Sequence, residues 1–159
     1  MSNRITQSMK ATFDELYGRL LTAIEVCPDA VWVRKTGGFY YWHLLMHCFG
    51  TIDNFAKQPG EARSQNVFST EETSMGKVRE TVPSKAEILA LGKTMIAVGD
   101  QYFDSLTDDR LFERHEGRSK HRGYEVTQHT ALLNIIAHGY YHVGVCSMVL
   151  REHGIKDIN

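Results

Sequence analysis

Apolar residues recur every three or four positions in four stretches of the chain, a spacing that predicts amphipathic α-helices. These stretches cover residues 5–26, 39–57, 84–106 and 126–153. Strict alternation of apolar and polar residues, typical of half-buried strands, is weak everywhere, and the sequence contains no internal repeat or low-complexity segment. The pattern therefore predicts an all-α protein with four main helices.

The connection between the second and third predicted helices, residues 58–83, is polar and too long for a simple hairpin. It can cross the whole molecule, so that the second and third helices run in the same direction. Ser84 and Glu87 form the pattern of a capping box at the start of the third helix, and Gly154 closes the fourth. Four amphipathic helices with one long crossover predict a four-helix bundle, and such bundles build metal sites from side chains on facing helices.

The chain of 159 residues has the length of a single domain, and we expect one domain over residues 1–159. Its 42% hydrophobic and 23% charged residues are ordinary for a globular protein that buries a core. The net charge of −1 gives no sign of a nucleic-acid or anionic-membrane partner. No apolar run approaches the roughly 20 residues of a membrane span, and the first residues lack the apolar segment of a signal peptide. We therefore expect a cytoplasmic protein that binds neither nucleic acid nor membrane.

The three cysteines, Cys27, Cys48 and Cys146, are odd in number and form no CxxC pair. Neither a disulfide framework nor a zinc ribbon is therefore indicated. Cys48 and Cys146 lie on apolar helix faces, where we expect small buried hydrophobic side chains. Because Cys146 follows His142 by four residues, its alternative role is a metal ligand or a reactive thiol.

Two histidines, His138 and His142, lie one helical turn apart inside the apolar stretch 131–146. Residues i and i+4 share one helix face, where two imidazoles can bind one metal ion at about 2.0–2.1 Å each. The opposite side of the helical wheel collects a more polar set: His129, Tyr140, Gly144, Ser147 and Arg151. Burying a protonated imidazole without a partner costs free energy, so both rings should be neutral. Two neutral imidazoles on one inward face predict ligands of a metal ion. The alternative is two neutral core histidines, each hydrogen-bonded to a carbonyl or a carboxylate.

A third ligand is needed, because a catalytic zinc-type site uses three protein ligands and keeps one position open. The second predicted helix offers His43 and His47. His47 lies at the border of the apolar face and is the better inward ligand. His43 points further away, and we interpret it as a surface residue or as one that supports a ligand. Asp53 lies too far around the helix to join His47, whereas Asp14 or Glu15 of the first helix stays open as an acidic fourth ligand.

The connection between the third and fourth helices, residues 107–125, contains a basic segment at residues 114–123. This segment can grip an anionic substrate or a thiol cofactor through Arg118 and Arg122. The alternative is a solvated loop, which is the more common role of such a charge run. We expect solvated side chains for three further histidines: His115, His121 and His129.

Two aromatic pairs, Tyr40-Tyr41 and Tyr140-Tyr141, lie close in sequence to the candidate ligands. Such rings can line a pocket or pack against the core. Packing is the more frequent role, and we interpret both pairs in this way.

The order and spacing of these motifs resemble the DinB/YfiT-like family of metal-dependent proteins. In that family an apolar run ends in a histidine and is followed by a short apolar segment and an acidic residue, as His47 and Asp53 are here. The last helix of the family carries His-x-x-x-His, which His138 and His142 match. The family often has a Gly-Gln pair after this motif, and Val145 stands in place of the glutamine. The resemblance covers nearly the whole chain.

The resemblance implies a three-histidine metal site of His47, His138 and His142, an up-down-down-up bundle, and frequent homodimers. The family includes thiol-dependent S-transferases and isomerases that use low-molecular-weight thiols. Because one fold serves many reactions, membership does not fix the chemistry. Zinc, nickel or another divalent ion suits imidazole ligands, which do not discriminate sharply between these metals.

The sequence therefore predicts a metal-dependent enzyme acting on a small-molecule substrate, of the thiol S-transferase or hydrolase type. The motif at residues 138–142 has Gly139 where zincin proteases carry the glutamate that acts as general base. This difference supports an alternative, a non-catalytic metal-binding or stress-related bundle that acts as a dimer.

Overall fold

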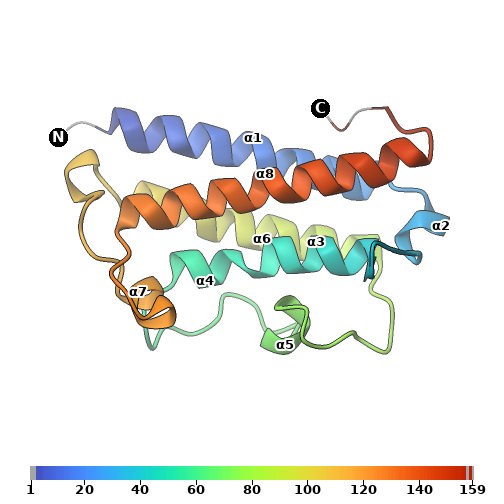
Figure 1. Cartoon of the computed structure of the whole chain (residues 1–159), viewed down its shortest axis with the longest axis horizontal. Coiled ribbons are helices and arrows are strands. Elements are labelled where there is room, and N and C mark those ends of the chain that lie inside the picture. Colours follow the sequence, from blue (N-terminus) through green and yellow to red (C-terminus); the bar gives the residue numbers. More distant parts are fainter. Residues whose placement is uncertain (1–2, 157, 159) are drawn as a thin grey trace.

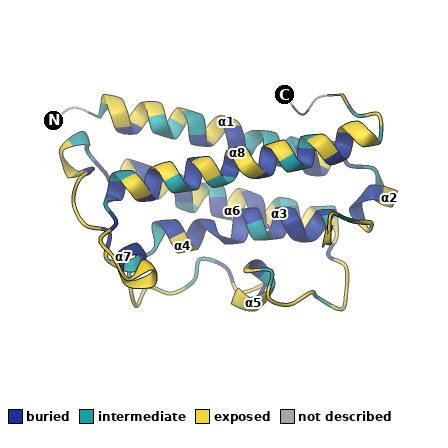
Figure 2. Cartoon of the chain, viewed as in Figure 1, coloured by how far each residue is buried: buried dark blue, intermediate teal, exposed yellow. Residues whose placement is uncertain are grey.

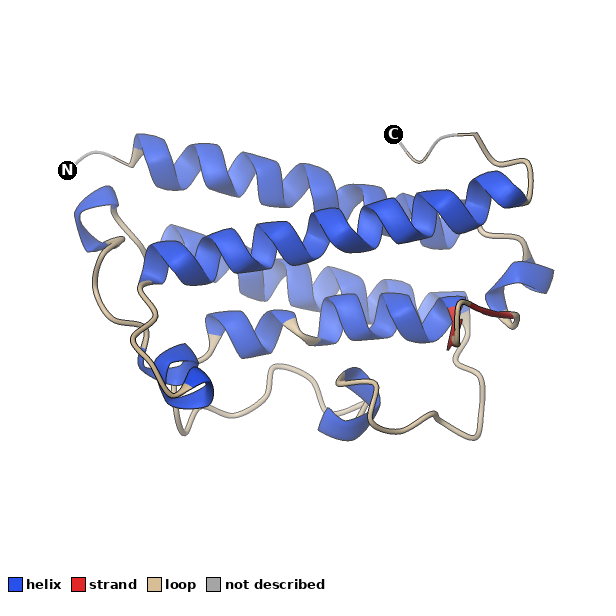
Figure 3. Ribbon diagram, in the orientation of Figure 1, coloured by secondary structure: helices blue, strands red, loops and turns tan. Residues whose placement is uncertain are grey.

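The structure is a computed structural model that describes residues 3–156 and 158. Most of these residues are helical, which confirms the all-α prediction, and Figure 3 shows one short pair of strands among them. Four long helical segments lie alongside one another (Figure 1). They are α1 (Arg4–Val26), α3 with its continuation α4 (Tyr41–Gly50 and Ile52–Ala56), α6 (Lys85–Asp104) and α8 (Gln128–Glu152).

These segments match the four predicted helices to within a few residues, apart from the second. α1 packs against both α6 and α8, and α3 packs against the same two helices. In Figure 1, α1 and α8 run from left to right, whereas α3, α4 and α6 run from right to left. The connection between α4 and α6 follows the lower edge of the molecule from one end to the other (Figure 1).

Side-chain caps determine where the two later helices begin. The Ser84 hydroxyl accepts the backbone N–H of Glu87, whose carboxylate accepts the N–H of Ser84, so the predicted capping box of α6 is confirmed. Thr127 accepts the N–H of Thr130 in the same manner and starts α8 two residues later than predicted. Each cap satisfies backbone donors that the first helical turn leaves without partners.

The core lies between the facing sides of the long helices, where Figure 2 shows continuous buried positions. Phe13 and Tyr17 of α1 are fully buried at its centre, with ring centroids 4.5 Å apart. The Phe13 ring lies so close to Gly99 that a Cβ at position 99 would collide with it. A glycine on α6 therefore lets the aromatic ring of α1 pack directly against the helix backbone.

The second predicted helix, residues 39–57, is corrected in two places. Its first two residues form strand β2 (Phe39–Tyr40), which pairs antiparallel with β1 (Lys35–Thr36). The turn between them is Gly37-Gly38, with φ angles of 60° and 93°, which glycine adopts without strain. The helix is also interrupted at Thr51, which separates α3 from α4 and whose hydroxyl donates to the Cys48 carbonyl.

Four further short helices lie in segments that we predicted as connections. They are α2 (Asp29–Trp32), α5 (Thr70–Thr73), the 3₁₀-helix η1 (Asp108–Arg110) and α7 (Glu116–Arg122). Each has too few residues for an apolar period to be recognised in sequence. Among the helices described, none combines the length and the apolar character that crossing a bilayer requires.

Candidate metal centre

The three predicted ligands come together between two packed helices. α3 carries His47, and α8 carries His138 and His142 on the side that faces α3. The Nε2 atom of His138 lies 3.3 Å from Nε2 of His47 and 3.1 Å from Nε2 of His142. These histidines lie close enough to bind one metal ion.

The nitrogen spacing can be compared with a tetrahedral site. Zinc–imidazole bonds of about 2.0–2.1 Å at tetrahedral angles place two ligand nitrogens about 3.3–3.4 Å apart. The two Nε2–Nε2 separations that involve His138, 3.1 and 3.3 Å, are close to that value. Both pairs therefore already have nearly the nitrogen spacing of a tetrahedral site.

Hydrogen bonds on the far side of two rings define which nitrogen carries the proton. His47 Nδ1 lies 2.8 Å from the carbonyl oxygen of Thr73, so Nδ1 donates and Nε2 keeps its lone pair. The Thr51 hydroxyl donates to the Cys48 carbonyl, and its oxygen lies 3.5 Å from His138 Nδ1, a long contact in which Nδ1 can be the donor. The tautomer with both protons on Nδ1 turns the Nε2 lone pairs of His47 and His138 toward each other, an arrangement that a cation between them stabilises.

His142 is the most deeply buried of the three histidines. Its side chain is 2% exposed, and its Nδ1 atom is buried with no hydrogen-bond partner. A buried ring nitrogen without a partner costs free energy. The ring is held by packing instead, with the Tyr141 ring 5.1 Å away and the His138 ring 4.4 Å away between centroids.

Burial keeps the three imidazoles neutral. Loss of solvent is the first cause that lowers the pKa of His138 to about 4, followed by the nearby His47 and Arg118 charges. The same desolvation, together with His138 and His47, lowers the pKa of His142 to about 3. Desolvation also lowers the pKa of His47, although its bond to the Thr73 carbonyl opposes the shift. Neutral imidazole is the form that binds metal, so protons compete weakly for this site near pH 7.

The prediction of a surface position for His43 is wrong. Its side chain is 2% exposed, its Nε2 lies 2.8 Å from the Glu72 carbonyl oxygen, and its ring stacks on Trp42. The bond to Glu72 keeps Nε2 protonated and turned toward the crossover. His43 therefore lies outside the three-histidine group, and the contact that buries it comes from α5.

Helix α5 of the crossover thus contacts both histidines of α3. Its residues Glu72 and Thr73 offer their carbonyl oxygens to His43 and His47, respectively. Ser69 and Glu72 form a reciprocal capping box that closes this single turn. The pattern Ser-x-x-Glu at residues 69–72 was visible in the sequence as a helix start, but the short helix after it was not recognised.

The basic segment is helical and partly buried, so the solvated-loop prediction is wrong for His115, Arg118 and Ser119. His115 is fully buried, donates from Nε2 to the Phe55 carbonyl at 2.7 Å, and caps α7 through the N–H of Arg118. Arg118 is 6% exposed, and its guanidinium carbon lies 4.6 Å from the centroid of the Phe55 ring. The Phe55 ring lies in turn 5.8 Å from that of His138, so Arg118 brings positive charge near the histidine group.

The exposed side chains of His121 and Arg122 agree with the prediction of a solvated segment. His129, which lies outside this segment on α8, is half-buried rather than solvated, with its ring 5.7 Å from that of Phe112.

Tyr140 and Tyr141 are 54% and 64% exposed, so neither packs into the core as predicted. Tyr141 lies against the His142 ring and lines the neighbouring cavity.

The other candidate ligands lie outside the group. Asp53 accepts hydrogen bonds from the backbone and hydroxyl of Ser64, and Asp14 and Glu15 are exposed on α1. The three cysteines are buried and unpaired, which confirms the predicted burial of Cys48 and Cys146. Burial raises the pKa of Cys146 to about 12, so it is a neutral thiol near pH 7. Among the described residues, no carboxylate or thiol joins the three histidines.

Two cavities lie along α3 near the histidines, although none of the three histidines lines either cavity. One, of about 210 Å³, is lined by Leu44, Tyr141 and Val145 together with other mainly apolar side chains. The second, of about 160 Å³, includes Asp53 and Thr73 and is more polar in its residues. The first cavity includes Leu44, which lies one turn before His47, and Tyr141, which precedes His142 in sequence, so it is the mainly apolar cavity near the site.

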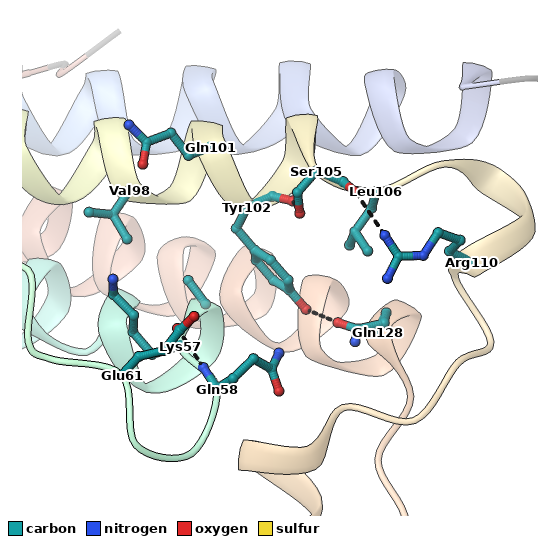
Figure 4. Close-up of a pocket in the computed structure, with 11 residues that line it drawn as sticks. Lys57, Gln58, Glu61, Val98, Gln101, Tyr102, Ser105, Leu106, Arg110 and Gln128 are labelled. Carbon is teal, nitrogen blue, oxygen red and sulfur yellow. Dashed lines mark hydrogen bonds between the residues drawn. The ribbon is translucent and has the colours of Figure 1, made fainter.

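A separate polar cavity of about 320 Å³ lies where α4 ends and α8 begins (Figure 4). The hydroxyl of Tyr102 donates to Gln128 Oε1 at 2.6 Å, and Figure 4 shows this bond between Lys57 on one side and Arg110 on the other. Gln128 precedes His138 by ten residues, a distance of about 15 Å along α8. This cavity therefore belongs to a different part of the molecule from the metal centre.

Comparison of the chain with models of known protein families, with curated proteins and with solved structures gives no match. The chemistry of the site therefore follows from its own residues. These are three neutral imidazoles, spaced for one ion, with a mainly apolar cavity beside them.

Proposed function

We propose that the protein binds one divalent metal ion through His47, His138 and His142, and that it is a metal-dependent enzyme. The observation that carries the proposal is the convergence of three imidazoles, in which Nε2 of His138 lies 3.3 Å from Nε2 of His47 and 3.1 Å from Nε2 of His142. Zinc and nickel are the first candidates, because imidazole nitrogen suits both ions. Three protein ligands leave a coordination position open, which is typical of catalytic sites.

The reaction type that we propose is thiol S-transfer or hydrolysis on a small-molecule substrate. A divalent ion with three neutral ligands keeps its charge and lowers the pKa of a coordinated water or thiol. The cavity at Leu44 and Tyr141 suits the apolar part of a substrate. The charge of Arg118 near His138 favours an anionic group, such as that of a low-molecular-weight thiol cofactor.

We further propose that the chain is a DinB-like four-helix bundle in up-down-down-up order. Support comes from the course of the four long segments in Figure 1 and from the long crossover between α4 and α6. The order of one histidine on α3 and two on α8 supports the same family. Unpaired cysteines suit the reducing cytoplasm, which is the location that we propose.

The first test is metal analysis of protein purified without a metal-affinity tag. We expect about one zinc or nickel ion per chain in the wild type and loss of most of this metal in His138→Ala. His121→Ala is the matched control, because its exposed side chain lies outside the group. An absence of bound metal, with equal metal affinity in both variants, would remove the proposal.

Activity is tested on the same preparations. Thiol-conjugation and hydrolase assays on metal-loaded protein should show turnover that chelation abolishes and that added metal restores. The alternative is a non-catalytic metal-binding protein, which the glycine at position 139 favours because no general base follows His138. A chain whose melting temperature falls strongly on chelation but which shows no turnover in any assay would favour this alternative.

A further inference from the structure

The polar cavity between the end of α4, α6 and the start of α8 lies apart from the candidate metal centre. Its volume of about 320 Å³ falls within the range of small-molecule sites, about 300–1,000 Å³. The two cavities near the histidines, of about 210 and 160 Å³, are smaller. The side chains around the polar cavity therefore deserve the same scrutiny as those of the metal centre, because their charges determine which ligand it suits.

The buried wall of the cavity is a hydrogen-bonded polar pair. The side chains of Tyr102 and Gln128 are both buried, and the Tyr102 hydroxyl donates to Gln128 Oε1 at 2.6 Å. The amide nitrogen of Gln128 in turn reaches the Arg114 carbonyl at 3.4 Å. Because each group is oriented by a partner, this polar wall is already formed in the chain without a ligand.

Two cations stand on opposite sides of this pair (Figure 4). Among the residues that the structure describes, none forms an ion pair with the Lys57 ammonium. Arg110 is held through Nε by the Glu113 carboxylate at 3.0 Å and through Nη1 by the Ser105 carbonyl at 3.1 Å. A guanidinium has five N–H donors, so these bonds fix the group in place and leave donors for a ligand.

A third cation lies behind the buried pair. Arg118 is buried, its Nε has no hydrogen-bond partner, and its Nη1 donates to the Asn54 carbonyl at 3.5 Å. Within the described part of the chain, no carboxylate forms an ion pair with it. Burial raises the pKa of the Tyr102 hydroxyl, and the charge of Arg118 opposes that shift, so this charge acts on the cavity wall. A buried cation without a counter-charge costs free energy, which a nearby anion would offset.

One carboxylate, that of Glu61, also lines the cavity. Its side chain is exposed, and its Oε2 accepts the backbone N–H of Gln58 at 2.8 Å. Together with Lys57 and Arg110 it leaves the lining with one positive charge in excess, to which Arg118 adds from behind. The cavity is therefore electropositive and favours an anionic ligand.

We propose that this cavity is a second ligand site and that it binds a small linear dicarboxylate, such as glutarate. One carboxylate pairs with Lys57 and the other with the planar fork of Arg110, which matches a carboxylate in shape. The methylene groups between them contact Val98 and Leu106, which flank Tyr102 on α6 (Figure 4). Cations on opposite sides favour a ligand with a charge at each end over a compact anion, which can reach only one of them. The site is independent of metal binding at the histidines.

The test is an NMR titration of the full-length ¹⁵N-labelled chain with glutarate. We expect saturable shifts of the Gln128 side-chain amide and of the backbone amides of Lys57 and Arg110, with a dissociation constant that rises with salt. Glutaramide, the uncharged analogue, and cadaverine, a diamine of the same chain length, should cause no such shifts. Inorganic phosphate should bind more weakly than glutarate.

Single substitutions test the two cations separately. Lys57→Gln and Arg110→Gln should each raise the dissociation constant for glutarate by about fivefold, the upper range for a partly exposed ion pair. Lys93→Gln removes an exposed charge of α6 outside the cavity and is the matched control, with the affinity of the wild type. His138→Ala, which should lose metal, should keep its glutarate affinity, so the two sites are measured independently. Circular dichroism verifies that every variant is folded.

Several results would overturn the inference. An absence of saturable shifts with glutarate would exclude the site, and shifts centred on His47 and His142 would place the dicarboxylate at the metal centre instead. Equal affinity for phosphate would exclude a ligand held at both ends, and binding of cadaverine would reverse the assigned charge. If Lys93→Gln weakened binding as much as Lys57→Gln does, net charge rather than the cavity would explain the affinity.

Discussion

At the scale of single residues, the environment of each titratable group decides its role more than its position on a helical wheel. Asp14, which the sequence left open as a metal ligand, lies instead beside Asp100 of α6. Partial burial is the first cause that raises the pKa of Asp14 to about 6, and Asp100 adds to the shift through a shared hydrogen bond and its charge. Lys10, 2.8 Å from Asp104, opposes it in part.

The raised pKa of Asp14 gives a prediction with a definite sign. Between about pH 4 and pH 6 the folded chain holds a proton that the unfolded chain has released, so the free energy of unfolding falls as pH rises through this window. Asp14→Asn should therefore be more stable than the wild type at pH 7, with the difference disappearing below pH 4. Urea unfolding at both pH values measures this.

Glu15→Gln removes a neighbouring charge from the same exposed side of α1 and serves as the control. It should change the free energy of unfolding less than Asp14→Asn does at pH 7. Equal stabilisation by the two variants would attribute the effect to net charge and contradict the role of Asp100.

At the scale of elements, the close contact between α1 and α6 depends on Gly99, which has no side chain to collide with Phe13. Gly99→Ala should destabilise the protein by about 1–2 kcal/mol, because overpacking against Phe13 outweighs the better helix propensity of alanine. Gly18→Ala, on α1 with open space around its Cβ, should instead stabilise by up to about 1 kcal/mol. Urea denaturation compares the pair, and similar effects of both changes would contradict the close packing.

The short helix α5 links the crossover to the metal centre. Ser69→Ala removes its capping box and should loosen the Thr73 carbonyl that orients His47. Because partners of metal ligands typically contribute 10–100-fold to affinity, we expect metal affinity to fall by about tenfold. Chelator competition measures the change.

Ser84→Ala removes the equivalent cap of α6, away from the histidines. We expect it to lower the melting temperature while leaving metal affinity unchanged. If Ser69→Ala also binds metal as tightly as the wild type, the crossover plays no part in orienting the ligand.

At the scale of the whole molecule, the long helices and the shared face of His138 and His142 were predictable, because both follow from a period of 3.6 residues. His47 was the better candidate on its own helix because it borders the apolar face. The hairpin at Gly37-Gly38 was missed, because strands of two residues carry no recognisable alternation. The burial of His43 and His115 was missed for a different reason. The His43 ring is covered by α5 of the crossover and the His115 ring by the end of α4, both distant in sequence. A helical wheel contains no information about which other segments pack against the helix.

The course of α8 has a consequence for how the protein tolerates sequence change. One side of this helix holds two candidate ligands, the next packs on α1, and the outward side carries no charge over residues 126–150. Substitutions on ordinary exposed helix surfaces are usually close to neutral. The ligand positions of α8 and those that pack on α1 are not of that kind, so mutational drift should accumulate on the charged outer sides of α1 and α6 and spare these inward positions of α8.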